Sequence, residues 1–263
     1  MTRTMLVGTL LALSAATAGA QETKDWEWKG QLGDGRTVYL RNVNGDVRFE
    51  QGTGRTVEVR AEKRWRRGDP DDVRIEARQS SGGSGDIVIC ALWGERATCD
   101  EDGYHGNNER GRWNRDNDVS VHFVVRIPAN ARVVASTVNG GMTVDGTSAD
   151  IEARTVNGDV EARSTGGRVE ANTVNGDITV RTVARDSDGL EYATVNGSIT
   201  VELPANANAR VNLSTVNGRI SSDFPLTLDG DINPRRIRAT LGEGGPTIRA
   251  STVNGGIRLR RTN

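Results

Sequence analysis

General acid–base catalysis near neutral pH most often uses histidine, and this sequence contains only two. His105 lies in a glycine-flanked segment, whereas His122 alternates with Val121 and Phe123 and is expected on the solvent side of a strand. Nucleophilic catalysis needs a Ser or Cys beside such a base. No Gly-x-Ser-x-Gly motif and no phosphate-binding glycine loop occurs in the sequence. We therefore predict that the chain is not an enzyme and uses no cofactor.

A pair of aspartates is the feature that most favours an enzyme. Asp159 and Asp177 occupy the same position of a repeat, where a stacked sheet would separate them by about 4.8 Å. Retaining glycosidases hold their two carboxyl groups about 5–5.5 Å apart. Other repeats carry Gly, Ser or Arg at this position, which favours a variable, exposed turn. A polysaccharide-active β-helix enzyme, a lyase or a glycosidase, is therefore the alternative to a non-catalytic protein.

Cysteines and aromatic residues occur together in one part of the chain. Cys90 and Cys99 are separated by eight residues, which predicts a disulfide closing a hairpin or loop in an oxidising compartment. Two cysteines alone make a poor metal site, so we predict no bound metal. Trp93, Tyr104 and Trp113 lie within or beside this loop and are the candidate ligand contacts, since exposed rings bind sugars or proteins. The alternative is that the rings fold back and cover one face of the protein.

A tetrapeptide repeat determines which elements hold these residues. Thr-Val-Asn-Gly occurs six times, and a related Asn-Val-Asn-Gly places Asn44 in the same role. Repeats of this size indicate stacked supersecondary units. Stacked asparagines would form a ladder in which each amide bonds the next. Successive spacings are 18, 18, 21, 21 and 37 residues, for asparagines at positions Asn139, Asn157, Asn175, Asn196, Asn217 and Asn254.

A shorter period within each repeat defines the strands. Apolar residues such as Val133, Met142, Ile151 and Val160 recur every nine positions, and a second apolar residue follows each two positions later. This alternation is that of a strand with one buried face. We predict an all-β fold, a right-handed parallel β-helix (β-solenoid) of about 18–21 residues per coil. The Gly of each Asn-Gly is expected because glycine reaches positive φ without cost.

The two ends of the sequence suggest its organisation and location. Arg3, a short apolar stretch from Met5 to Ala18 and a small-residue site at Ala20 are typical of a secretory signal peptide. No second long apolar segment follows, so no transmembrane segment is expected. We predict an exported protein, periplasmic or extracellular. The predicted parts are a signal peptide (1–20), an N-terminal linker (21–35) and a single β-solenoid domain (36–263) with a protruding loop at about 93–118.

The charge balance bears on the class of partner. Removal of Arg3 with the signal peptide leaves 33 of the 34 basic residues against 35 acidic residues, a formal charge of 33 − 35 = −2. Nucleic-acid binding usually demands a basic face, so we predict no nucleic-acid partner. The C-terminal end is locally basic and is interpreted as a solvated charged end. It contains Arg235, Arg236, Arg238, Arg258, Arg260 and Arg261.

The repeated Thr-Val-Asn-Gly-Asp-(Val/Ile) units resemble the bacterial adhesin-like β-helix domains called toastrack domains. The closing segment from Gly242 to Ile257 resembles them as well, and the resemblance covers roughly residues 36–260. It implies an exported β-helix of unknown function, and it carries no catalytic residues to transfer. We predict a non-catalytic envelope or surface protein, an adhesin-like scaffold or binding module, with a glycan, cell-wall or protein partner. An oligomerising structural element of the envelope is a further alternative.

Overall fold

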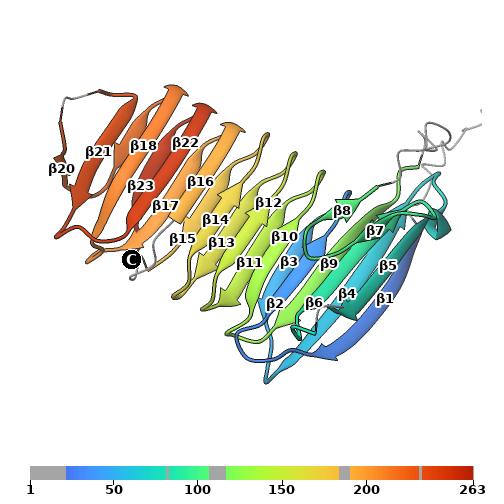
Figure 1. Cartoon of the computed structure of the whole chain (residues 1–263). Helices are drawn as coiled ribbons and strands as arrows, with labels where there is room; N and C mark the ends of the chain where they lie inside the picture. Colours follow the sequence, from blue (N-terminus) through green and yellow to red (C-terminus); the bar gives the residue numbers. More distant parts are fainter. Residues whose placement is uncertain (1–21, 81–82, 107–116, 184–189, 231–232, 263) are drawn as a thin grey trace, which may run out of the picture.

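The protein is a stack of β-coils built from two large sheets that face each other (Figure 1). The computed structural model describes residues 22–80, 83–106, 117–183, 190–230 and 233–262. One sheet has ten strands and the other eleven, and a separate two-stranded hairpin completes the described strands. This architecture confirms the predicted all-β solenoid.

The middle coils follow the predicted repeat. Each coil contributes one strand to each sheet, and neighbouring coils pair in parallel. Pairs such as Ile151 with Val169 are 18 residues apart, whereas Ile178 pairs with Ile199 across 21 residues. The eleven-stranded sheet receives β10 (Arg132–Ser136), β12 (Ile151–Arg154), β14 (Val169–Asn172) and β16 (Leu190–Asn196). The ten-stranded sheet receives β11 (Met142–Thr147), β13 (Val160–Ser164), β15 (Ile178–Arg181) and β17 (Ile199–Pro204).

The core lies between the two sheets. Ile151 and Ala153 of β12 are buried, whereas Glu152 between them points to the outer face. The same alternation holds in β13, β14 and β15, as period-two strands require. Two short apolar side chains per strand fill the narrow space between the sheets, which explains how a chain with 35% hydrophobic residues forms a continuous core.

The C-terminal coils do not stack in chain order. The chain passes through β18 (Ala209–Asn217), β19 (Ile220–Ser222), β20 (Leu226–Leu228) and β21 (Arg236–Leu241), and then turns back. Strand β22 (Thr247–Asn254) inserts between β16 and β18, and β23 (Ile257–Thr262) inserts between β17 and β19. The spacing of 37 residues therefore reflects a return into the stack rather than two further coils.

The N-terminal coils also stack out of chain order. Strands β2 (Thr37–Arg41) and β3 (Val47–Gln51) pair with β10 and β11, the first middle coil. The later strands β6 (Ile87–Trp93) and β9 (Ser120–Ile127) pair with β2 and β3 on the side away from the middle coils. The first and last regular coils of the chain are thus both internal to the stack (Figure 1).

Antiparallel strands close the N-terminal end of both sheets and, through β21 and β20, the C-terminal end of the eleven-stranded sheet, whereas the ten-stranded sheet ends in the parallel strand β19. At the N-terminal end β5 (Val73–Gln79) covers β6, and β4 (Thr56–Trp65) covers β9; η1 (Pro70–Asp72) is a short 3-10 turn before β5. Strand β1 (Glu22–Gln31) pairs with β4 and forms the outermost edge. The predicted linker over 21–35 is therefore wrong: alternating Trp26 and Trp28 pack against the core, which draws this segment into the sheet. Its charged outer residues discourage edge-to-edge pairing.

The predicted signal peptide lies outside the described residues. Within the described part of the chain, no helix has the length and apolar character that crossing a membrane requires.

Candidate functional site

The repeated tetrapeptides form one continuous edge of the stack, where the chain passes from the eleven-stranded to the ten-stranded sheet. The predicted asparagine ladder is present along it. Each side-chain amide donates to the carbonyl oxygen of the preceding asparagine at 2.7–2.9 Å. The spatial order is Asn44, Asn139, Asn157, Asn175, Asn196, Asn254 and Asn217, with the last two exchanged relative to the sequence.

The ladder leaves hydrogen-bonding capacity on the surface. A side-chain amide has two N–H donors and an oxygen with two lone pairs, and the ladder uses one of each in an internal asparagine. Asn157, Asn175 and Asn196 are exposed, so one N–H and one lone pair of each can bind water or a ligand.

The Thr and Gly of each repeat hold the coils together. The Thr173 hydroxyl donates to the Gly158 carbonyl of the neighbouring coil at 2.9 Å, and Thr155 donates to Gly140 at 3.0 Å. Gly45, Gly140 and Gly158 have the expected positive φ, at 112°, 158° and 157°. Gly176, Gly197, Gly218 and Gly255 do not, and at these positions glycine is required by space. A Cβ on Gly176 would lie 2.5 Å from the carbonyl carbon of Gly158, closer than any real side chain.

The valine of each repeat is the outward residue. These valines are 38–52% exposed, and they account for all but one of the exposed large hydrophobic residues in the described structure. Because neighbouring coils are in register, the valines form a row beside the asparagine ladder. We call this surface the valine–asparagine edge; it comprises the ladder asparagines with Val138, Val156, Val174, Val195, Val253 and Val216.

The disulfide region is a second candidate. Strand β6 is buried on both faces because the hairpin of β7 (Thr98–Cys99) and β8 (Tyr104–His105) covers its outer side. Val88, Cys90 and Leu92 form this small second core with the hairpin. The predicted Cys90–Cys99 disulfide is present and joins the two layers, with its Cα atoms 6.3 Å apart.

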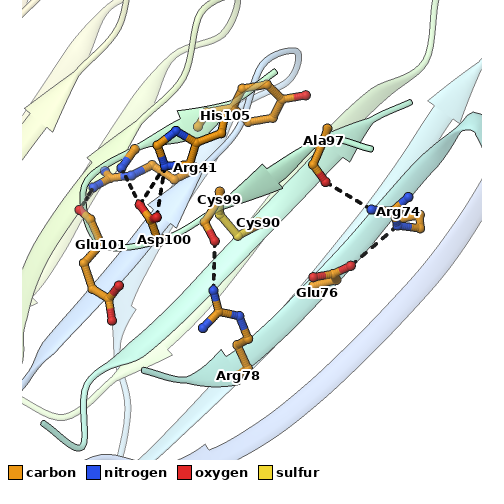
Figure 2. The surroundings of a disulfide bond; sticks show 12 residues. Arg41, Arg74, Glu76, Arg78, Cys90, Ala97, Cys99, Asp100, Glu101 and His105 are labelled. Carbon is orange, nitrogen blue, oxygen red and sulfur yellow. Dashed lines mark hydrogen bonds and ion pairs between the residues drawn. A yellow bond between two sulfur atoms is a disulfide. The ribbon is translucent and has the colours of Figure 1, made fainter. Parts of the chain in front are cut away.

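Three arginines fasten the hairpin by donating to its backbone carbonyls (Figure 2). Arg74 donates to Glu95 at 2.6 Å, Arg78 to Cys99 at 2.9 Å and Arg41 to Glu101 at 2.6 Å. Arg41 is buried beneath the hairpin, and loss of hydration lowers its pKa. These contacts hold the hairpin against the eleven-stranded sheet. The sequence did not predict these contacts, because each arginine resembles an ordinary outward residue of a strand. The unbroken apolar run of β6 is the signal that could have indicated a covering hairpin.

The candidate aromatic contacts do not form a surface platform in the described structure. Trp93 is 6% exposed and belongs to the main core, so its ring cannot meet a ligand. Tyr104 is half-buried, and its hydroxyl accepts the Trp93 backbone N–H at 3.2 Å. Inward alternation along β6 explains the burial of Trp93. Trp113 lies outside the described residues.

The family model described as Toastrack DUF4097 matches residues 33–260. The chain belongs to the toastrack family. No curated protein matches it.

Solved structures similar to this toastrack chain have low sequence identity. A "putative cell adhesion protein" from Clostridium sporogenes aligns with a TM-score of 0.50 and 10% identity, over 91% of this chain and 100% of its own. A "putative adhesin" from Bacteroides fragilis aligns at 0.39 with 11% identity, over 93% and 98% of the two chains. A "putative lipid binding protein" from Parabacteroides distasonis gives 0.32 and 10%, over 94% and 98%. The similarity to the Clostridium sporogenes structure supports the fold and nothing further.

The candidate catalytic groups of this toastrack chain have local partners. Asp159 accepts the Asp177 backbone N–H at 2.7 Å, and Asp177 accepts that of Ser198 at 2.7 Å. Both carboxylates therefore tie successive turns together. His105 bonds the Asp100 carboxylate at 3.0 Å, which lowers the pKa of Asp100. Three or more metal-ligating side chains do not gather anywhere in the described residues.

Replacement of both cysteines by alanine is expected to loosen the hairpin without unfolding the solenoid. The disulfide closes a loop of about ten residues, for which chain entropy gives about 2–3 kcal/mol. The arginine contacts remain and retain part of the hairpin's order. Hydrogen exchange should accelerate in residues 97–105 and stay unchanged in β12 to β15. Accelerated exchange in those middle strands would contradict this account.

Proposed function

We propose that this protein is an exported, non-catalytic, adhesin-like scaffold that binds a glycan chain along the valine–asparagine edge. The observation that carries the proposal is the continuous row of exposed valines beside exposed amides. Soluble proteins rarely leave contiguous apolar surface without a use. A sugar ring presents an apolar C–H face and a rim of hydroxyls, and these match valine and asparagine respectively.

The repeat of the edge also suits a polymer. Equivalent residues of neighbouring coils lie about 4.8 Å apart, the strand spacing of a sheet. This is close to the length of one sugar unit in an extended chain. A rigid solenoid keeps the spacing constant, so successive coils can contact successive sugars with little loss of conformational entropy on binding.

Export is supported by two features of the sequence. Residues 1–20 have the pattern of a secretory signal peptide. The Cys90–Cys99 disulfide fits an oxidising compartment. Both are consistent with a periplasmic or extracellular location, where cell-wall and surface glycans are found.

The triple variant Val156→Thr, Val174→Thr and Val195→Thr tests the proposal. Threonine keeps the shape of valine but makes the row polar, so we expect at least a tenfold weaker affinity for neutral glycans. Residues 21–263 of wild type and variant would be applied to an array of neutral glycans and cell-wall fragments. Bound protein and dissociation constants are the readouts.

The matched control makes the reverse exchange on another surface. Thr143, Thr179 and Thr200 lie on the outer face of the ten-stranded sheet, and changing them to Val should leave binding unchanged. Failure of the wild type to bind any neutral glycan would overturn the proposal. Association of the wild type into dimers that the threonine triple variant lacks would instead assign the edge to self-assembly, the alternative of an oligomerising element.

A further inference from the structure

Four arginines surround Asn212 on the outer face of the eleven-stranded sheet, near its C-terminal end. Arg238 of β21 and Arg249 of β22 both pair in register with Asn212 of β18. Arg238 and Arg249 therefore lie two strand spacings apart, about 9.6 Å at the backbone. Arg210 lies two residues before Asn212 on the same strand, and Arg236 lies two residues before Arg238. All four are exposed. We call this cluster the arginine face.

The arginine face differs from the rest of the solenoid in charge pairing. Arginines on the outer faces of the middle coils have carboxylate partners: Arg154 meets Glu152 and Glu170, and Arg181 meets Glu202 at 2.7 Å. Across the described residues, no ion pair involves any of the four arginines of the arginine face. The sequence alone suggested a solvated charged end that included Arg236 and Arg238. The fold brings Arg210 and Arg249 beside them on one surface.

The acidic neighbours do not neutralise the face. Glu191 of the neighbouring strand β16 is exposed on the same outer face and pairs in register with Arg249, but the two make no ion pair within the described structure. Asp229 accepts from the Thr240 hydroxyl at 3.5 Å. Four positive charges against these two leave a surplus that an anionic partner could balance, since exposed charge of one sign attracts the opposite charge.

The residues between the arginines indicate the class of anion. Ser214, Ser251 and Thr240 occupy the register positions beside them, together with Asn212. No exposed large hydrophobic side chain lies among them that could insert into a bilayer. The cluster also contains no aromatic residue on which nucleic-acid bases could stack. Hydroxyls and an amide between guanidinium groups match a polymer that carries both hydroxyls and carboxylates.

We infer that the arginine face binds an acidic polysaccharide through its carboxylates. Arginine pairs with carboxylates in a bidentate manner, and the Arg238–Arg249 separation is close to a disaccharide repeat. This inference rests on the proposed function only in that the partner is a glycan. It uses a different surface, the outer sheet face rather than the valine–asparagine edge, and it names the charge of the partner.

The test compares two double variants with the same change in net charge. Arg238→Gln/Arg249→Gln removes two charges from the arginine face, whereas Arg163→Gln/Arg181→Gln removes two paired charges from the middle coils. The probe is polygalacturonate, with neutral dextran beside it, at low and high salt. We expect about tenfold weaker polygalacturonate binding for the first variant and less than a twofold change for the second. High salt should weaken wild-type binding.

Several outcomes would overturn the inference. Equal losses in the two variants would show an effect of net charge alone. Binding of the wild type to anionic lipid vesicles or single-stranded DNA, but not to polygalacturonate, would assign the face to another partner. The valine triple variant separates this inference from the proposed function: it should lose neutral-glycan binding and retain the polygalacturonate binding that depends on Arg238 and Arg249.

Discussion

Gly176→Ala is expected to destabilise the protein by about 3 kcal/mol or more, although it adds a single methyl group. The Cβ would press on the Gly158 carbonyl of the neighbouring coil, with the Asp159 nitrogen 3.0 Å away. These backbone atoms are held in place, because the Gly158 N–H donates to the Asn175 carbonyl and the Val160 N–H donates to the Asp177 carbonyl, both at 2.9 Å. The coils must therefore separate locally, which also weakens the Asn157–Asn175 rung. Urea denaturation with hydrogen exchange in β13 to β15 would measure the loss.

Gly141→Ala provides the matched control. Gly141 immediately follows the glycine of its own repeat, but its added Cβ would meet nothing closer than 3.6 Å. We expect a change below about 0.5 kcal/mol, the usual range for a surface substitution. Replacing glycine by alanine lowers the entropy of the unfolded chain and by itself favours folding. Equal losses of stability in both variants would therefore contradict the role of the close approach between coils.

Ile257→Ala is expected to cost about 3–4 kcal/mol, and Ile220→Ala only about 1 kcal/mol. The two isoleucines hold the same position in their repeats and pair with each other. Ile257 is 1% exposed, because β23 lies between β17 and β19; Ile220 is half-buried on the edge strand β19. The later residue in the chain is therefore the more deeply buried one.

The comparison of these two variants tests the exchanged order of the C-terminal coils. If coils stacked in chain order, Ile257 would lie at the end of the stack and Ile220 inside it, and the ranking would reverse. Unfolding of a solenoid need not be all-or-none, so local hydrogen exchange in β17 and β23 should accompany the denaturation midpoints. A larger loss for Ile220→Ala than for Ile257→Ala would contradict the structure.

The exchanged coils also affect how the chain can fold. Strands β22 and β23 enter between coils that are synthesised earlier, so β16 and β18 cannot complete their pairing until the last part of the chain arrives. Strand β2 is made early, but it pairs with both β6 and β10 and so completes its pairing only after those later strands are made. Such non-local pairing slows folding relative to a solenoid that grows coil by coil.

The local pattern of the sequence was sufficient to predict the repeating unit. Alternation at Ile151 and Ala153 gave the inward face, and the spacing of Asn157 and Asn175 gave the coil length and the amide ladder. The disulfide followed from Cys90 and Cys99. These features depend on residues close in the chain or at a fixed period, and a periodic pattern allows one register that buries all the apolar residues.

Only the tertiary structure decided where the coils stand and which surfaces they create. The sequence could not place β22 inside the stack, because its repeat matches several neighbours equally well and the choice depends on the long connection through β20 and β21. It could not show that Trp93 is buried by its strand and that Arg41 lies under a hairpin. It could not gather Arg210, Arg238 and Arg249 around Asn212, since strand pairing alone brings these distant residues together. Periodicity determines each coil, whereas the order of the coils determines the surface.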